Sequence, residues 1–191
     1  YPLIMAGSLA IGILILSSLG SSFGDYGSMD KMVNKAKLTQ EDLKRGEQYG
    51  QNYYDLGTIE NSPSRLVKLM PKAIIAGLYR PFIWEARNPF MALSGLENLF
   101  TMLLSLSILY RARVIRMFSF IGRDPILIFT LLYTFMFSYG IGLASANFGA
   151  LARYRIPGMP FLMLSLFVLD YYLKEDKKKK EREAMINKLR Q

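Results

Sequence analysis

The stretch from Leu78 to Glu97 reads Leu-Tyr-Arg-Pro-Phe-Ile-Trp-Glu-Ala-Arg-Asn-Pro-Phe-Met-Ala-Leu-Ser-Gly-Leu-Glu. It places four charged side chains beside the only tryptophan of the chain: Arg80, Glu85, Arg87 and Glu97. The residues after it are apolar enough to begin a membrane-spanning helix, whereas those before it mix apolar and basic side chains. We therefore interpret the stretch as the junction between a segment in the membrane interface and a spanning helix.

On the C-terminal side, residues 90–173 form apolar blocks separated by short polar connections. The blocks are Phe90–Tyr110, Pro125–Ala146 and Ile156–Leu173, the last interrupted early by Pro157 and Pro160. About 20 mostly apolar residues are needed to cross the hydrocarbon core of a bilayer. In that core only helices and closed barrels satisfy their own backbone hydrogen bonds. The region 90–173 is therefore predicted to hold three transmembrane helices.

On the N-terminal side, residues 62–89 are predicted to hold an amphipathic interfacial helix over residues 62–82, followed by the segment around Trp84. A tilted or re-entrant segment is the alternative for the helix. Ser62 can cap this helix, Pro63 suits its first position, and Pro71 would kink it. Basic and apolar residues fall on opposite faces. The basic face holds Arg65, Lys68 and Lys72, and the apolar face holds Leu66, Leu69, Met70, Ala73 and Ile74.

Further toward the N-terminus, residues 1–23 carry no charge and are predicted to form another transmembrane helix. Residues 24–61 are predicted to form an external polar insertion. One helix should start at Ser28 and a second at Thr39, where Thr39 and Asp42 resemble a capping box. We expect the tyrosines of the insertion to pack on the bilayer interface. Because the first residue is not methionine, we also expect the chain to be the C-terminal part of a longer protein or a processed product.

The amino-acid composition limits the kinds of catalytic and metal-binding site that the chain can form. The 191 residues are 51% hydrophobic, carry a net charge of +9 and include no cysteine or histidine. This excludes zinc sites built on those residues, haem held by histidine, thiol catalysis and a Ser-His triad. We expect no metal and no cofactor. The positive charge is interpreted as basic cytoplasmic loops, not as a nucleic-acid surface.

Topology follows from the basic segments. The connection at residues 111–123 and the tail at residues 174–191 are richest in Lys and Arg, so both are predicted to be cytoplasmic. The tail should contact anionic lipid headgroups. Alternation of the spans then places residues 24–89 and the connection Asn147–Arg155 on the outer side.

Two polar clusters share that outer side in this topology. The first polar cluster is Arg80, Trp84, Glu85, Arg87 and Glu97, and the second is Asn147, Arg153, Tyr154 and Arg155. Arginine can grip a phosphate with two parallel hydrogen bonds. Substrate-binding candidates are Arg80, Trp84, Arg87, Asn147, Arg153 and Arg155, and catalytic candidates are Glu85 and Glu97.

Structural roles are the alternative for each of these residues. Arg80 with Glu85, or Arg87 with Glu97, could form ordinary ion pairs. Trp84 could be an interfacial anchor. A carboxylate inside a span is costly, so Glu97 should meet an arginine or line a wet cavity.

The patterns Arg80-Pro81-Phe82-x-Trp84-Glu85, Leu96-Glu97-Asn98 and Asn147-Phe148-Gly149-x-x-x-Arg153-x-Arg155-x-x-x-x-Pro160 together resemble a group of bacterial polytopic membrane proteins. These proteins accompany glycosyltransferases in polysaccharide loci. The resemblance covers roughly residues 62–173 and implies the inner membrane and a polyprenyl-diphosphate-linked glycan as substrate. It implies diphosphate binding by Arg80, Arg153 and Arg155. Unlike multi-spanning glycosyltransferases, this chain has no histidine and few spans, so a catalytic half would have to precede Tyr1.

The sequence thus predicts an all-α integral membrane protein. It should have about four transmembrane helices, one amphipathic interfacial helix and an external helical insertion. The leading functional hypothesis is a component of bacterial cell-surface polysaccharide assembly that binds its lipid-linked glycan through outward-facing arginines. The alternative is a non-enzymatic subunit packed against a larger membrane protein complex. Transport is less favoured, since few ionisable residues lie within the spans.

Overall fold

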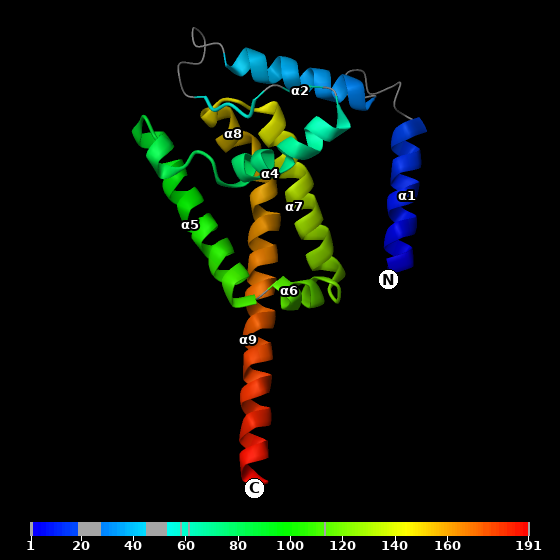
Figure 1. The fold of residues 1–191 in the computed structure, drawn as a ribbon, viewed down its shortest axis with the longest axis vertical. Helices are drawn as coiled ribbons and strands as arrows, with labels where there is room; N and C mark the ends of the chain where they lie inside the picture. Colours follow the sequence, from blue (N-terminus) through cyan, green and yellow to red (C-terminus); the bar gives the residue numbers. More distant parts are fainter. Residues whose placement is uncertain are drawn as a thin grey trace. The chain divides into compact units, whose positions relative to one another are not determined.

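The structure is a computed structural model that describes residues 2–18, 28–44, 53–57, 59–60, 62–112 and 114–190 (Figure 1). The regular elements in these ranges are all helical, which confirms the predicted all-α fold. The helices are α1 (Pro2–Ser18), α2 (Met29–Leu43), α4 (Pro63–Tyr79), α5 (Pro89–Ala112), α6 (Val114–Ile121), α7 (Pro125–Ala144), α8 (Phe148–Tyr154) and α9 (Met159–Leu189), with 3-10 helices η2 (Ile83–Glu85) and η3 (Ile156–Gly158).

Within the described ranges, three segments are long and apolar enough to cross a membrane: α5, α7 and the run from α8 through α9. They correspond to the three spans predicted in residues 90–173. The described part of α1 has 17 residues, about 25 Å at the usual helical rise. A span over residues 1–23 would extend beyond the described residues and stays a prediction.

The third span and the basic tail are one helix. Helix α9 runs without interruption from Met159 to Leu189, so the predicted boundary after Leu173 is a change of composition inside a helix (Figure 1). Ion pairs one turn apart support the exposed part, such as Lys177 with Glu181 and Lys179 with Glu183. The predicted contact of the tail with lipid headgroups stays a prediction.

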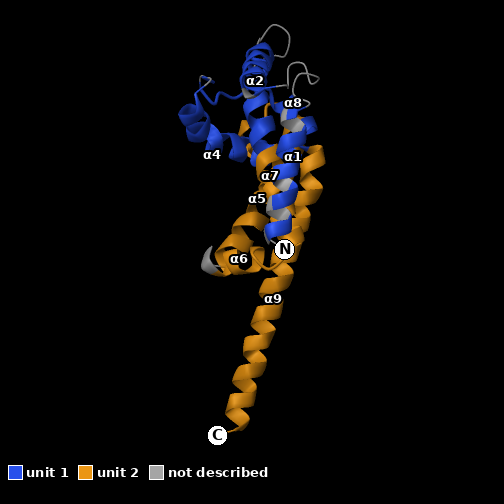
Figure 2. Cartoon of the chain, turned by 90° about the vertical axis from the view of Figure 1, so that its right-hand side faces the viewer, with its two compact units in different colours: residues 1–81, 138–155 blue, residues 82–137, 156–191 orange. Residues whose placement is uncertain are grey.

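The chain divides into two compact units (Figure 2). Unit 1 comprises residues 1–81 and 138–155, and unit 2 comprises residues 82–137 and 156–191. Helix α7 passes from unit 2 into unit 1 at Ser138, so its last turns belong with α2, α4 and α8.

In unit 1, α4 crosses α7 in close contact, because two glycines let the backbones meet. A Cβ added to Gly142 of α7 would overlap the backbone carbonyl of Ala73, and one added to Gly77 of α4 would overlap that of Ser138. The hydroxyl of Tyr139 also donates to the carbonyl oxygen of Leu66 at 3.2 Å. The crossing lies in the last two turns of α7, so α4 is held at the end of a spanning segment.

One prediction about the region of helix α2 is wrong. Its start is as expected, since the hydroxyl of Ser28 accepts a hydrogen bond from the Lys31 N–H at 3.3 Å. No second helix begins at Thr39, because α2 continues through it to Leu43. Val33, Gln40 and Leu43 are buried at the spacing of one helix face. That face requires an unbroken helix, and Leu43 packs with Ala146 and Ala150.

The segment after α2 is also more buried than predicted. Tyr54 was expected at the bilayer interface, but it is only 3% exposed, and Leu56 and Ile59 are buried as well. Between them, the carboxylate of Asp55 accepts a hydrogen bond from the Gly57 N–H at 2.9 Å. Gly57 has a φ of +93°, which other residues adopt only with strain.

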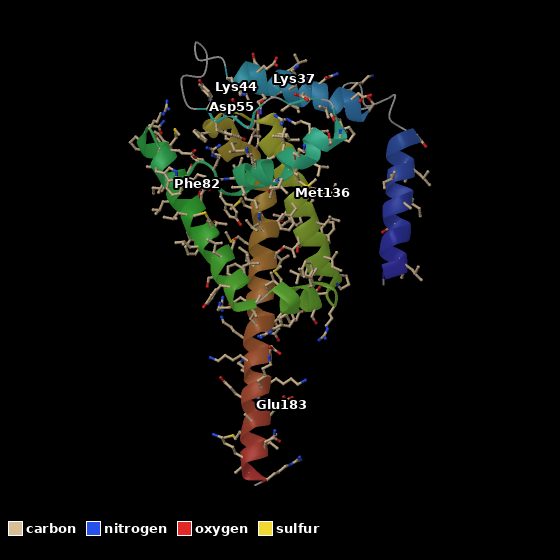
Figure 3. All side chains as sticks on the ribbon, viewed as in Figure 1. Lys37, Lys44, Asp55, Phe82, Met136 and Glu183 are labelled. Carbon is tan, nitrogen blue, oxygen red and sulfur yellow. The ribbon has the colours of Figure 1, made fainter. Side chains whose placement is uncertain are left out.

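Asp55 also pairs with the ammonium group of Lys44 at 2.6 Å (Figure 3). The hydrogen bond from Lys44, followed by that from the Gly57 N–H, lowers the pKa of the Asp55 carboxyl. A carboxyl whose pKa is lower in the folded state contributes stability that is present above its unfolded pKa of about 3.9. That contribution is lost as the pH falls through the folded pKa.

We therefore expect Asp55→Asn to lower the free energy of unfolding at neutral pH, and we expect this difference to shrink as the pH falls below about 3.9 and through the lowered folded-state pKa. The difference should be under about 1 kcal/mol, because the pair is solvent-exposed. Unfolding of both proteins at several pH values measures it. An equal difference at pH 3 and pH 7 would show that the ionised pair is not its cause.

In unit 2, polar side chains gather at one end, where α5 ends and α7 begins. The contacts there are Arg111–Asp170 (2.7 Å), Lys174–Asp170 (2.7 Å), Arg116–Asp176 (3.4 Å) and a hydrogen bond from the Tyr172 hydroxyl to Asp124 (2.8 Å). They join the connection 111–123 to α9. The structure thus brings the predicted cytoplasmic connection and the start of the predicted cytoplasmic tail to the same end of the unit.

Candidate functional site

Arg80 is the first residue after α4. Its N–H donates to the Ala76 carbonyl oxygen at 3.1 Å, while its own backbone is extended, so the chain leaves the helix there. Pro81 follows through a cis peptide bond. Proline cannot continue the hydrogen bonding of a helix. The local sequence therefore places Arg80 at the end of α4, close to the crossing with α7.

The guanidinium of Arg80 lies on two aromatic rings. Its Cζ is 4.8 Å from the ring centroid of Tyr54 and 5.8 Å from that of Phe148. The rings stack on each other with centroids 5.5 Å apart. Both aromatic residues are buried, whereas Arg80 is half-buried. Cation–π contact of this kind holds a guanidinium in place over the faces of the rings.

Backbone contacts position these two rings. The Tyr54 N–H donates to the Ala146 carbonyl oxygen at 2.9 Å, and its hydroxyl donates to the Gly142 carbonyl oxygen at 3.1 Å. Phe148 begins α8, and the preceding Asn147 caps that helix. The side-chain oxygen of Asn147 accepts hydrogen bonds from two backbone N–H groups, at 2.8 and 3.2 Å. Asn147 is therefore a structural cap, which is the usual role of asparagine at a helix start.

Arg155 fixes the backbone of Arg80. Its side chain is buried, and its Nη1 donates to the Arg80 carbonyl oxygen at 3.1 Å. Arg153, in contrast, is exposed near the end of α8, with its Nε bonded to the Gly149 carbonyl oxygen at 3.2 Å. The structure thus brings Arg80 and Arg155 together. It assigns Arg155 an inward-facing role and leaves Arg153 at the surface.

The remaining members of the first polar cluster belong to unit 2. The Glu85 carboxylate accepts a hydrogen bond from the Phe82 N–H at 2.9 Å and so closes the turn at η2. Trp84 stacks on Phe82 with ring centroids 4.7 Å apart and is 70% exposed. Arg87 is exposed just before α5. Because Arg80 lies in unit 1, the predicted cluster is divided between the two units.

Glu97 lies on the exposed side of α5. Its neighbours on that side are apolar, with Leu93 65%, Leu96 55% and Phe100 66% exposed. Among the described residues no ion pair involves Glu97, so the alternative pair with Arg87 is not formed. Its known contact is through the backbone, where its carbonyl oxygen accepts from the Thr101 hydroxyl at 2.9 Å.

Sequence reasoning does not identify Tyr54 or Phe148, the rings that hold Arg80. They are far apart in the chain, and a tyrosine in a polar loop has no pattern that predicts burial. Comparisons of the chain with protein-family models, with curated proteins and with solved structures found no match. The geometry of unit 1 therefore has to support any functional assignment.

Proposed function

We propose that unit 1 binds the diphosphate of a polyprenyl-linked glycan, with Arg80 as the principal phosphate ligand and Arg153 as a second. The chain would then be an inner-membrane component of bacterial cell-surface polysaccharide assembly, with its C-terminus in the cytoplasm. The observation that carries the proposal is the placement of the Arg80 guanidinium on the stacked rings of Tyr54 and Phe148.

The position of Arg80 relative to α7 supports this function. The ring beneath Arg80 is bonded to Gly142, and α4 crosses α7 at the same residue. Gly142 is in the last turn of a segment that can span the membrane. Arg80 therefore belongs at the level where lipid headgroups and the diphosphate of a polyprenyl carrier would lie.

The charge and geometry of the arginine side chain also support the proposed diphosphate binding. Arginine donates charge-assisted, paired hydrogen bonds to phosphate oxygens. A guanidinium held by aromatic rings and by a fixed backbone loses little conformational freedom on binding, so more of the interaction energy appears as affinity. Arg155 and Asn147 are positioning residues in this proposal, because their side-chain groups bind backbone atoms.

The proposal assigns binding and no catalytic step to this chain. Glu85 is used to close the turn at η2. Glu97 lies on an exposed, largely apolar face of α5, and none of the ion pairs among the described residues involves it. A transferase or polymerase acting on the bound lipid would provide the catalytic groups.

We expect Arg80→Ala and Arg153→Ala each to reduce surface polysaccharide in the host bacterium at least about tenfold, the effect of losing one charged hydrogen bond. Membrane insertion should be unchanged, and it can be measured as the amount of protein in the membrane fraction. Arg182→Ala, on the exposed part of α9, is the matched control and should leave glycan output normal. Normal output in both Arg80→Ala and Arg153→Ala would contradict the substrate role.

The alternative function, a non-enzymatic subunit of a larger membrane complex, is favoured by Glu97. A carboxylate facing lipid from inside a spanning helix costs about 2.5–3.5 kcal/mol. A partner helix that offers a hydrogen-bond donor to Glu97 would offset that cost. Under this alternative, a photo-crosslinker at Leu96 should capture a stoichiometric partner, and Glu97→Gln should preserve that capture better than Glu97→Leu.

A further inference from the structure

The side of α4 that faces away from α7 is exposed and divides into two adjoining strips. Its buried residues are Leu69, Ala73, Ala76, Gly77 and Leu78. At about 100° per residue, the exposed residues Val67 and Ile75 form an apolar strip on this side. Lys68 and Lys72 form a basic strip on the same side of the helix, next to Ile75.

The third basic residue of α4, Arg65, lies on the same face of the helix as Lys72 but makes a contact of its own. Arg65 is only half-exposed, and its Nη2 lies 3.7 Å from the position that a Cβ on Gly57 would take. Arg65 therefore faces the segment 53–60. Among the described residues no carboxylate pairs with Lys68 or Lys72, which are both exposed.

The depth of α4 relative to the spanning segment α7 indicates which molecules can contact these two strips. The helix crosses α7 at Ser138 and Gly142, within the last turns of a spanning segment. At that depth an apolar strip meets acyl chains, and a neighbouring pair of lysines meets the phosphate layer. Lysine commonly buries its aliphatic stem on apolar surface while its ammonium group reaches the headgroups.

We propose that the exposed side of α4 is a binding face for anionic phospholipid, with Lys68 and Lys72 as its phosphate ligands. The two lysines are four residues apart, so their ammonium groups can approach one headgroup from the same side of the helix. The proposal does not depend on Arg80 or on the polyprenyl-linked substrate. It gives the interface a preference for acidic lipid that a purely apolar helix would lack.

A fluorescence titration tests this face. Because the chain has no cysteine, Val67→Cys provides a single attachment site for a polarity-sensitive dye on the apolar strip. The labelled full chain in neutral detergent is titrated with dioctanoyl phosphatidylglycerol and, separately, with dioctanoyl phosphatidylcholine. We expect the anionic lipid to bind more tightly, with an affinity that falls as salt is added.

Lys68→Ala/Lys72→Ala should weaken phosphatidylglycerol binding by about 30-fold, the loss expected for two basic residues at a headgroup layer. Phosphatidylcholine binding should not change, and Lys68→Arg/Lys72→Arg should retain the preference. Circular dichroism checks that each variant is folded. Lys179→Ala/Lys188→Ala, on the exposed part of α9, is the control with equal charge loss.

Because the dye is attached to α4, its response reports lipid bound at this face and not lipid bound near Arg80. Equal affinities of the unsubstituted chain for the two lipids would overturn the proposal and would favour an acidic protein as the occupant. Retention of the preference in Lys68→Ala/Lys72→Ala would also overturn it.

Discussion

Gly142→Ala is expected to destabilise the chain by about 2–3 kcal/mol, the usual cost of forcing extra volume into a packed contact. The added methyl group would overlap the carbonyl of Ala73, which is backbone and cannot rotate away. The helices α4 and α7 would have to separate. Gly77→Ala should have a similar effect, because its methyl group would overlap the carbonyl of Ser138.

Gly140 provides a matched control on the same helix. A Cβ at Gly140 would meet nothing within 4 Å. Gly140→Ala should therefore leave stability unchanged or raise it by up to about 1 kcal/mol, because alanine favours helix over glycine. The measurement is unfolding of the purified proteins in detergent, followed by circular dichroism. Equal stability of Gly142→Ala and Gly140→Ala would show that α4 does not cross α7 at this glycine.

Arg80→Ala is expected to weaken binding of undecaprenyl diphosphate by about 10- to 100-fold, the range for losing a hydrogen bond between charged groups. The remaining Arg153 and the rings of Tyr54 and Phe148 cannot replace a guanidinium that is held against them. Arg80→Lys keeps the charge, but lysine lacks the planar fork that pairs with phosphate oxygens. Its affinity should therefore lie between those of Arg80→Ala and the unsubstituted chain.

The helical architecture could be predicted from the sequence because its determinants are local. The apolar blocks in residues 90–173 exceed the thickness of a bilayer core, and they appear as α5, α7 and α9. Ser28 and Pro63 mark the starts of α2 and α4 as expected. These signals depend on hydropathy and capping, which need no knowledge of the tertiary structure.

The predictions from the sequence are wrong where tertiary contacts, and not local sequence signals, determine the structure. A capping pattern at Thr39 predicts a new helix, but burial of Gln40 and Leu43 on the same face as Val33 keeps α2 continuous. Tyr54 reads as a surface aromatic, yet its hydroxyl is bonded to Gly142 far along the chain. Neither contact leaves a local pattern in the sequence.

The site was predicted in part. Charge and residue type identified Arg80 and Arg155, and the structure connects them through the Arg80 carbonyl oxygen. The sequence could not show that Arg155 is buried and acts on backbone. It also could not show that Trp84 and Glu85 fall in the other unit. Proximity along the chain suggested one cluster, whereas the chain passes from one compact unit to the other after Pro81.

Arg80 is proposed to bind the diphosphate of a lipid-linked substrate. The most direct measurement is the dissociation constant of undecaprenyl diphosphate for the full chain in nanodiscs of neutral lipid, which removes competition by anionic headgroups. Arg80→Ala should raise this constant by about 10- to 100-fold, while Arg182→Ala should leave it unchanged. Equal constants for Arg80→Ala and the unsubstituted chain would contradict the claim.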